Sequence, residues 1–318
     1  MKNTQINRRK ALSGLGALAG AAFLPHISIP ASAKTYAKKA DSFIYCLNMS
    51  TLRGQNVGFV KELELAAETG YDAVEIWMPP LQEYVKNGGS LSDLKKRIDD
   101  LGITVEDAIG FAQWIVDDEA TRKQAMEQLK QEMDMLAQIG CPRIAAPPAG
   151  ATNEPGLDLL KAAERYHAIL ELGEQTGVMP QLEVWGFSQN LHLLGEVLFV
   201  AAESGHPKAR ILPDVYHIYK GGSDFNGLKL ISGSTIEIFH MNDYPASPAR
   251  EQMDDSHRVY PGDGIAPLSQ ILGDLQQAGG RKILSLELFN RSYWEQDALT
   301  VAKNGLQKMK AAVANASL

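Results

Sequence analysis

Residues 157–186 read LDLLKAAERYHAILELGEQTGVMPQLEVWG, and they contain the pattern that decides the fold. A stretch with apolar residues at three-and-four spacing runs into Gly177, and a short apolar run then ends near Glu183. The spacing predicts a helix with one face on a core. A glycine after its last turn predicts the left-handed residue that ends the helix and returns the chain toward a sheet.

The same junction recurs along the chain, as an amphipathic stretch, a glycine and an apolar run. The glycines are Gly70, Gly102, Gly140, Gly177, Gly205, Gly233 and Gly280, and the runs are AVEIWM (73–78), ITVEDAIG (103–110), RIAAPP (143–148), MPQLEVWG (179–186), ARILPDV (209–215), TIEIFH (235–240) and KILSLEL (282–288). With the opening run FIYCLNMS (43–50) there are eight predicted strands.

Strands that alternate with helices and are too apolar to leave either face in water predict a parallel sheet covered by helices. We therefore expect the α/β class, as a (β/α)8 TIM barrel over residues 43–318. The alternative is an open doubly wound sheet, which usually carries a glycine-rich phosphate loop after its first strand. The segment MSTLRGQNVG (49–58) is not such a loop, so the closed barrel is favoured.

Residues 1–33 have the composition of a removable secretory signal. Arg8, Arg9 and Lys10 precede an apolar stretch (11–24), and Ala31-Ser32-Ala33 resembles a cleavage site. The paired arginines indicate the twin-arginine type, so we expect the twin-arginine translocase as a partner and a periplasmic or otherwise exported protein. Residues 34–42 form a short linker. A disordered basic terminus and an uncleaved anchor are the alternatives.

Charge and composition exclude several classes of protein. The net charge is −7, and loss of the signal removes four positive charges and no acid. Such a surface repels phosphate backbones, which argues against a nucleic-acid partner. No second apolar run is long enough to span a membrane.

A homo-oligomer is one expected assembly. Cys46 and Cys141 are expected as core residues, with a disulfide between them as the alternative.

Four residues suited to bind a divalent metal lie at or near the ends of predicted strands: Glu183, Asp214, His240 and Glu287. Any one alone would more often be a salt bridge or a helix cap. The carboxyl ends of parallel strands meet at one rim, so we expect the four to surround a single ion. Three carboxylates and one imidazole favour Mn²⁺, with Mg²⁺, Co²⁺ or Zn²⁺ as alternatives.

The second predicted strand also ends in Glu75-Ile76-Trp77, and the third carries Glu106 as a rim residue. Two further residues are expected at the same rim. His217 follows Asp214 by three positions and could donate a hydrogen bond to a substrate oxygen, or else cap the next helix. Arg258 lies in a long loop (241–264) and is followed by Pro261-Gly262-Asp263-Gly264. Its guanidinium could neutralise an alkoxide or enediolate, or else staple the loop to an aspartate.

With these motifs the chain resembles the sugar phosphate isomerase/epimerase group, the xylose isomerase-like TIM barrels. The resemblance covers all of residues 43–318 through the Glu, Asp-x-x-His, His, Arg-x-x-x-Gly-x-Gly and Glu series. It implies that the ligands of the ion are Glu183, Asp214, His240 and Glu287. It also implies that Glu183 and Glu287 exchange protons with a substrate carbon, and that His217 and Arg258 hold a substrate oxygen.

The chain also departs from members of this group. Ketose 3-epimerases usually follow the strand-five glutamate with Pro-x-Asn, whereas Glu183 is followed by Val-Trp-Gly-Phe-Ser-Gln-Asn, so ordinary ketohexose epimerisation is not expected. The endonuclease IV branch needs more histidines than this rim offers. No cluster of lysines and arginines provides a phosphate cradle, so the expected substrate is unphosphorylated.

The expected substrate is a small carbohydrate, with Trp77, Trp185 and Phe289 as the wall for its apolar face and Asn242 as a polar contact. The function expected is a metal-dependent isomerase or epimerase of a sugar or keto-sugar derivative that acts through an enediolate. The alternatives are a metal-dependent lyase or dehydratase, of the inosose or 3-keto-glycoside type, and a non-catalytic sugar-binding barrel.

Replacing Arg8 and Arg9 by lysine should leave the precursor in the cytoplasm, because the translocase reads the arginine pair. The wild-type protein should be exported, with a mature N-terminus near Lys34. Cell fractionation and N-terminal sequencing measure both. Wild-type protein found unprocessed in the cytoplasm would contradict the expected location.

Overall fold

The computed structural model describes residues 43–316. The predicted signal and the predicted linker lie outside these residues. Eight parallel strands form the inner layer: β1 (Phe43–Asn48), β2 (Ala73–Trp77), β3 (Thr104–Ile109), β4 (Arg143–Ala146), β5 (Met179–Glu183), β6 (Ile211–Leu212), β7 (Ile238–Met241) and β8 (Lys282–Leu286).

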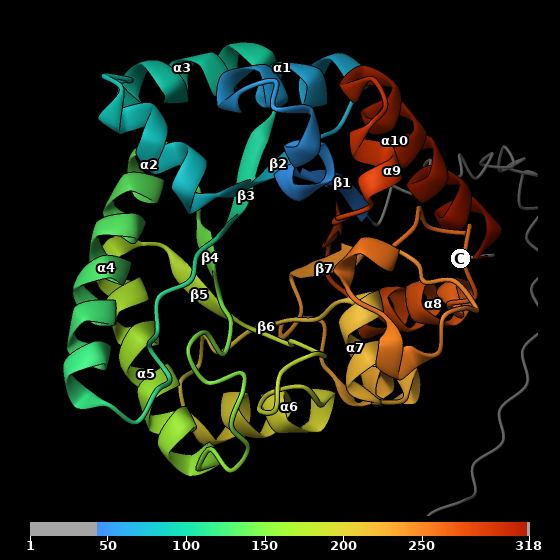
Figure 1. Cartoon of the computed structure of the whole chain (residues 1–318). Helices are drawn as coiled ribbons and strands as arrows, with labels where there is room; N and C mark the ends of the chain where they lie inside the picture. Colours follow the sequence, from blue (N-terminus) through green and yellow to red (C-terminus); the bar gives the residue numbers. More distant parts are fainter. Residues whose placement is uncertain (1–42, 317–318) are drawn as a thin grey trace, which may run out of the picture. The chain divides into compact units, whose positions relative to one another are not determined.

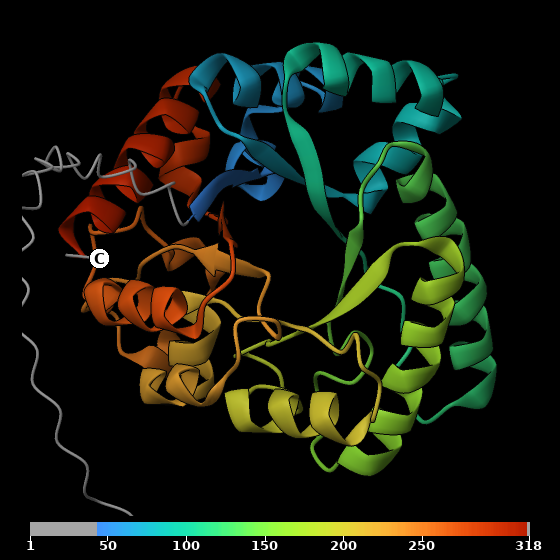
Figure 2. The same cartoon turned by 180° about the vertical axis from the view of Figure 1, so that it is seen from behind.

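Helices surround the strands in an outer ring, which Figures 1 and 2 show from opposite ends. They are α1 (Phe59–Thr69), α2 (Met78–Lys86), α3 (Leu91–Leu101), α4 (Glu119–Gln138), α5 (Leu159–Thr176), α6 (Leu194–Glu203), α7 (Val215–Gly221), α8 (Leu268–Ala278), α9 (Arg291–Trp294) and α10 (Ala298–Asn315). Short 3-10 helices are η1 (Met49–Gln55), η2 (Phe225–Leu230), η3 (Arg250–Gln252) and η4 (Asp255–His257).

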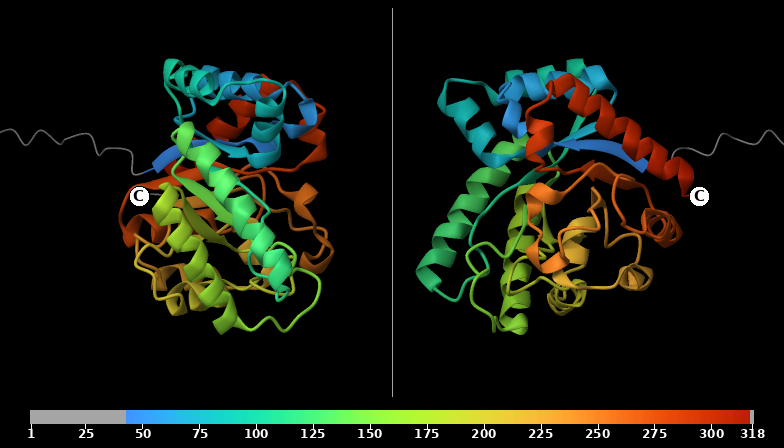
Figure 3. Two further views of the ribbon diagram at one scale, coloured as in Figure 1. Left: turned by 90° about the vertical axis from the view of Figure 1, so that its left-hand side faces the viewer. Right: turned by 45° about the vertical axis from the view of Figure 1, so that its right-hand side comes forward.

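The strands follow one another around the barrel. Ladders join β3-β2-β1-β8-β7 and β4-β5-β6, and single bridges at Ile211 with Ile236 and Asp214 with His240 link β6 to β7. The side views in Figure 3 show the long α4 and α10 packed against the outside of the strands. The predicted barrel is therefore confirmed.

Most of the glycine junctions work as the sequence predicts. Six of the seven glycines have a positive φ, which glycine adopts without steric cost. Gly233 is the exception: a Cβ there would lie 2.1 Å from the carbonyl oxygen of Gly279, so the residue allows two backbones to approach closely. The predicted strand over 209–215 is much shorter than expected, because Asp214 already caps α7.

The core has two layers, as period-two strands require. A small inner cluster fills the barrel, and a larger one lies between strands and helices. Cys46 belongs to the inner cluster and Cys141 to the outer one, and both are buried and free, as expected. Within residues 43–316, helices of the length and apolarity needed to cross a membrane are absent.

Glu62 on α1 is a buried carboxyl whose pKa burial raises from 4.5 to about 7, while Arg53 lowers it only in part. The folded state therefore binds this proton more tightly than the unfolded chain does. Its contribution to stability is complete below pH 4.5 and is lost as pH rises through 7.

Glu62→Gln should consequently increase the free energy of unfolding at pH 8.5 by ~2 kcal/mol and change it little at pH 5. Urea unfolding at the two pH values measures this. Glu68→Gln, at an exposed position of the same helix, is the control and should have no effect at either pH. An equal gain for Glu62→Gln at both pH values would contradict the assignment.

A candidate metal centre and active site

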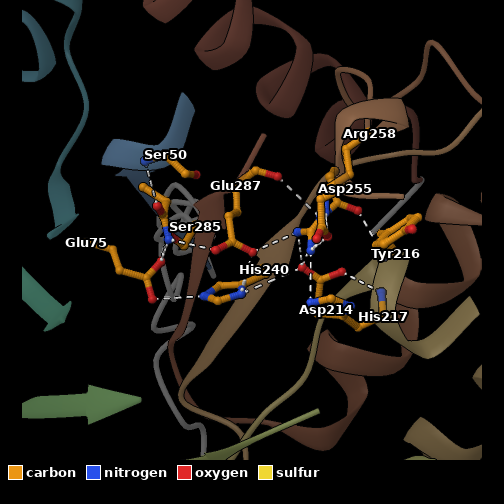
Figure 4. Close-up of polar contacts among 12 residues, drawn as sticks. Ser50, Glu75, Asp214, Tyr216, His217, His240, Asp255, Arg258, Ser285 and Glu287 are labelled. Atoms are coloured by element: carbon orange, nitrogen blue, oxygen red, sulfur yellow. Dashed lines mark hydrogen bonds and ion pairs between the residues drawn. The ribbon is translucent and has the colours of Figure 1, made fainter. Parts of the chain in front are cut away.

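Side chains alternate between the two faces of a strand, and this alternation places three of the predicted ligands at the mouth of the barrel. Asp214 lies two residues beyond Leu212, His240 two beyond Ile238 and Glu287 four beyond Ile283, and each of these apolar residues belongs to the inner cluster. An even number of steps keeps a side chain on the same face of a strand. The three side chains therefore point into the mouth from adjacent strands (Figure 4).

Asp214, His240 and Glu287 form a compact buried group. Their ligand atoms all lie within 4.8 Å of one another. His240 Nδ1 is 3.1 Å from Glu287 Oε2 and 3.7 Å from Asp214 Oδ2. Burial alone would lower the pKa of His240, but the charges of Glu287 and Glu75 outweigh it and raise the pKa well above the ordinary value.

Glu183 is the last residue of β5 and is also buried, but it is not in this group of three. Burial raises its pKa to about 8; His240 counteracts this, and the charge of Glu287 adds to it. For Glu287 itself burial would raise the pKa, but His240 and Arg258 outweigh burial and lower it. The two glutamates therefore lie near enough for the charge of one to affect the pKa of the other, and their pKa values shift in opposite directions.

Arg258 reaches the group from the long loop after β7. Its Nη1 donates to Asp214 Oδ2 at 2.8 Å and to Glu287 Oε2 at 2.7 Å. Its Nη2 donates to Asp255 Oδ1 at 2.6 Å, so the loop-stapling pair considered from the sequence forms as well. One fully buried guanidinium thus joins the loop to the carboxylates of Asp214 and Glu287 (Figure 4).

His217 lies beside Arg258 with both ring nitrogens facing N–H groups. Nδ1 accepts from the backbone N–H of Gly186 at 3.2 Å, and Nε2 lies 2.9 Å from Arg258 Nη2. Burial lowers the pKa of His217 and Arg258 lowers it further, so the ring is neutral. Arginine can only donate, so Nε2 also faces an N–H group, and a neutral ring can accept at only one of its two nitrogens. Asp214, rather than His217, caps α7 by accepting from His217 N.

Asn242 is fully buried, and both ends of its amide are used. Nδ2 donates to Asp214 Oδ2 at 3.0 Å, and Oδ1 accepts from Tyr216 N at 2.9 Å. These contacts hold Asp214 in place. The substrate contact expected for Asn242 stays a prediction.

Glu75 is a carboxylate behind the site that the sequence marked only as a strand-end residue. Its Oε1 lies 2.8 Å from His240 Nε2, and its Oε2 accepts from Asn48 Nδ2 at 2.8 Å and from Ser285 Oγ at 2.5 Å. A carboxylate on one ring nitrogen fixes the tautomer and the orientation of a histidine that uses its other nitrogen for a metal. His240 Nδ1 is consequently the nitrogen turned toward Asp214 and Glu287.

Glu106, read from the sequence as a strand-three rim residue, does not lie there. The β2–β3 register shifts after Val74, so that Glu75 pairs with Asp107 and Glu106 is the extra residue of a bulge. Glu106 instead pairs with Arg143, the first residue of β4, at 2.8 Å. A bulge changes which residues face inward, and the alternation of the sequence does not reveal it.

Aromatic rings follow one another around the mouth. Neighbouring ring centroids lie 5.1–6.2 Å apart. In order, the rings of this aromatic arc are Phe289, Trp77, Phe111, Trp185 and Phe187. The arc contains the three aromatics chosen from the sequence and adds Phe111 and Phe187, whose exposed fractions are 37% and 46%. Exposure cannot be read from residue type, which is why these two were not selected.

The residues of the site fit a divalent cation. His240 Nδ1 and Glu183 Oε2 are buried and have no hydrogen-bond partner of acceptable geometry among the described residues. An unpaired buried polar atom costs about 1–3 kcal/mol, and a cation that bound them would remove that cost. Carboxylates and imidazole are ligands of Mg²⁺, Mn²⁺, Co²⁺ and Zn²⁺. The buried group of Asp214, His240 and Glu287 could therefore hold such an ion.

Comparison with known proteins agrees with the fold. The profile of the xylose isomerase-like TIM barrel family matches residues 63–312. The chain is 28% identical over 267 residues to an inosose isomerase of Halalkalibacterium halodurans, covering 81% of this chain and 93% of that protein. It is 23% identical over 261 residues to a 3-dehydroshikimate dehydratase of Pseudomonas putida, covering 78% of this chain and 39% of that protein.

Among solved structures, that of IolI protein with a bound zinc atom superposes with a TM-score of 0.78 at 24% identity. The match covers 86% of this chain and 98% of that one.

His240→Ala should abolish metal binding, because it removes a ligand at the centre of the group. Glu75→Gln keeps His240 but weakens its orientation, and should reduce metal affinity by about 10–100-fold. Chelator competition and elemental analysis measure both. The control is Glu62→Gln, which also neutralises a buried carboxyl but does not contact the group. Full metal occupancy in His240→Ala would refute the ligand assignment.

Proposed function

This chain belongs to the xylose isomerase-like TIM barrel family, and from that premise we propose that it is a divalent-metal-dependent isomerase or epimerase of a sugar or keto-sugar derivative. The observation that carries the proposal is the buried group of Asp214, His240 and Glu287, with Glu183 at the end of β5 beside it. Two glutamates from different strands are what proton removal and return at one carbon require.

The proposed chemistry divides among residues of the chain. A divalent ion, when bound, would polarise a carbonyl and stabilise the charge that develops as the adjacent carbon loses a proton. One of Glu183 and Glu287 takes the proton from one face of that carbon, and the other returns a proton to the opposite face. His217 and Arg258, whose Nε2 and Nη2 atoms lie 2.9 Å apart, are proposed to hold a substrate oxygen at the mouth.

We propose a single ion, with Mn²⁺ as the first candidate because the ligand set is rich in oxygen. Zn²⁺ is the strongest alternative, since the similar IolI protein has a bound zinc. Mg²⁺ and Co²⁺ are further alternatives. The aromatic arc is proposed to pack against the apolar face of the substrate ring. Export by the twin-arginine route remains part of the proposal.

A dehydratase or lyase is the second candidate, and one observation favours it. The Arg53 guanidinium lies 3.7 Å from the ring centroid of Trp77 at the mouth. Among the described residues its side chain makes no hydrogen bond or ion pair, although the charges of Glu287 and Glu62 act on it. A free guanidinium can bind a carboxylate, as an acidic substrate such as 3-dehydroshikimate would need. Elimination would lose water or an aglycone, whereas isomerisation conserves mass.

Turnover in D2O should place solvent deuterium on one carbon next to the carbonyl. The assay uses metal-supplemented protein with inososes, ketoses and 3-keto-glycosides, followed by NMR and mass spectrometry. Glu183→Gln and Glu287→Gln should each lower kcat by roughly 100-fold or more, the size of a lost acid or base.

Metal content must be measured in each variant, because a lost ligand would mimic a lost base. Glu171→Gln, on the exposed side of α5, is the control and should retain activity. Product that contains no deuterium at carbon would refute proton exchange with solvent and favour an internal hydride shift. Ligand binding without turnover of any compound would favour a sugar-binding protein.

A further inference from the structure

A cavity adjoins the candidate site. This side pocket has a volume of about 420 Å³ and lies between the loop after β5, the first turn of α7 and the loop that precedes Arg258. Some of the residues that line it also make hydrogen bonds to residues of the candidate site. Gly186 donates to His217 Nδ1, and Asp255 accepts from Arg258. Phe187, the end of the aromatic arc, has its ring 5.7 Å from that of His217.

The side pocket contains a buried hydroxyl without a partner. Tyr216 lines it and is 1% exposed, and its hydroxyl makes no hydrogen bond with any described residue. Its ring lies under the Arg258 guanidinium at 4.8 Å, which holds the side chain in place. Leaving a buried hydroxyl unpaired is unfavourable, and this one is closed off from solvent, so a ligand in the pocket would reach it only with a small shift of the wall.

Two carboxylates at the pocket have free acceptor atoms. Asp254 and Asp255 both line it. Asp254 uses Oδ1 to accept from Ser256 and His257, and Asp255 uses Oδ1 to accept from Arg258. The Oδ2 atoms of both remain to accept hydrogen bonds from ligand hydroxyls.

The charge of the pocket selects against an anion. Among the described residues, Lys220 is the one lysine or arginine that lines it, and its ammonium already donates to the carbonyl oxygens of Arg250, Glu251 and Met253 at 2.7–3.0 Å. With two carboxylates and no free ammonium or guanidinium, the pocket would repel a phosphate or a carboxylate. A neutral ligand with several hydroxyls suits it.

An aromatic face completes the pocket. Phe187 is 46% exposed, which is unusual for a side chain of its size, and Gln189 also lines the pocket. An exposed ring next to hydroxyl, amide and carboxylate groups matches a sugar ring, which has an apolar C–H face and a polar edge.

We propose that the side pocket binds a second, neutral sugar ring, so that the substrate is a glycoside rather than a free monocyclic sugar. The ring that reacts lies against Asp214, His240 and Glu287, and its glycosyl substituent extends past Phe187 into the side pocket. The inference rests on the proposed function for the reacting ring, but the pocket's own contacts define the substituent.

The test compares two neutral keto-glucosides that differ only in the substituent, a methyl group or a glucosyl residue. The wild-type protein should exchange solvent deuterium into the glucosyl compound with at least tenfold higher kcat/KM. Gln189→Ala and Tyr216→Phe, which remove only pocket groups, should each lower the ratio of kcat/KM for the two compounds about tenfold. Gln277→Ala is the matched control, since Gln277 lines a separate pocket beside α8, and should keep the wild-type ratio.

The outcomes separate the two proposals. Exchange into both compounds with equal kcat/KM, or a ratio that neither pocket variant changes, would overturn the glycoside inference while leaving the proposed function in place. If neither compound exchanges, the proposed function fails, and saturation-transfer NMR with the glucosyl compound then decides the inference. Transfer to the glucosyl protons that is lost in both variants would support the pocket, and absence of transfer in the wild-type protein would overturn it. Circular dichroism confirms that the variants are folded.

Discussion

The contact of buried acids with the guanidinium of Arg258 and the imidazole of His240 is the constraint on which the site depends. Asp214 and Glu287 are nearly inaccessible to water, and ionised carboxylates in such a place are costly unless they are paired. Arg258 bridges Asp214 and Glu287, and the imidazole of His240 lies within 3.7 Å of both. Removing Arg258 would leave negative charge buried without compensation.

This requirement explains why the loop after β7 is ordered. Arg258 is contributed by that loop, and Asp243 organises its return toward α8. The Asp243 carboxylate accepts from the backbone N–H groups of Tyr244, Gly262, Gly264 and Ala266. A Cβ on Gly264 would lie 2.2 Å from the carbonyl oxygen of Tyr244, so only glycine fits there. The Gly-Asp-Gly turn after Arg258 therefore acts on the site by closing the loop that delivers the guanidinium.

The residues beneath and behind the mouth of the barrel set the orientation of the side chains in the site. The inner apolar cluster fills the barrel beneath the mouth, and the carboxylate of Glu75 lies behind His240. Because Glu75 holds Nε2, the free nitrogen of His240 faces Asp214 and Glu287. The aromatic arc and the side pocket surround the mouth, so the same strand ends present both polar ligands and an apolar wall.

The sequence by itself determined the barrel and most of its rim. Helix periodicity, glycine junctions and apolar runs are local properties, and parallel strands leave one arrangement in which Asp214, His240 and Glu287 can meet. Only the tertiary structure decided which side chains face one another. The bulge at Glu106 shifted the inward face, Glu75 acquired its role by pairing with His240, 165 positions away, and Tyr216 was left with an unpaired hydroxyl. Such contacts depend on register and packing between distant segments, which residue type and spacing do not specify.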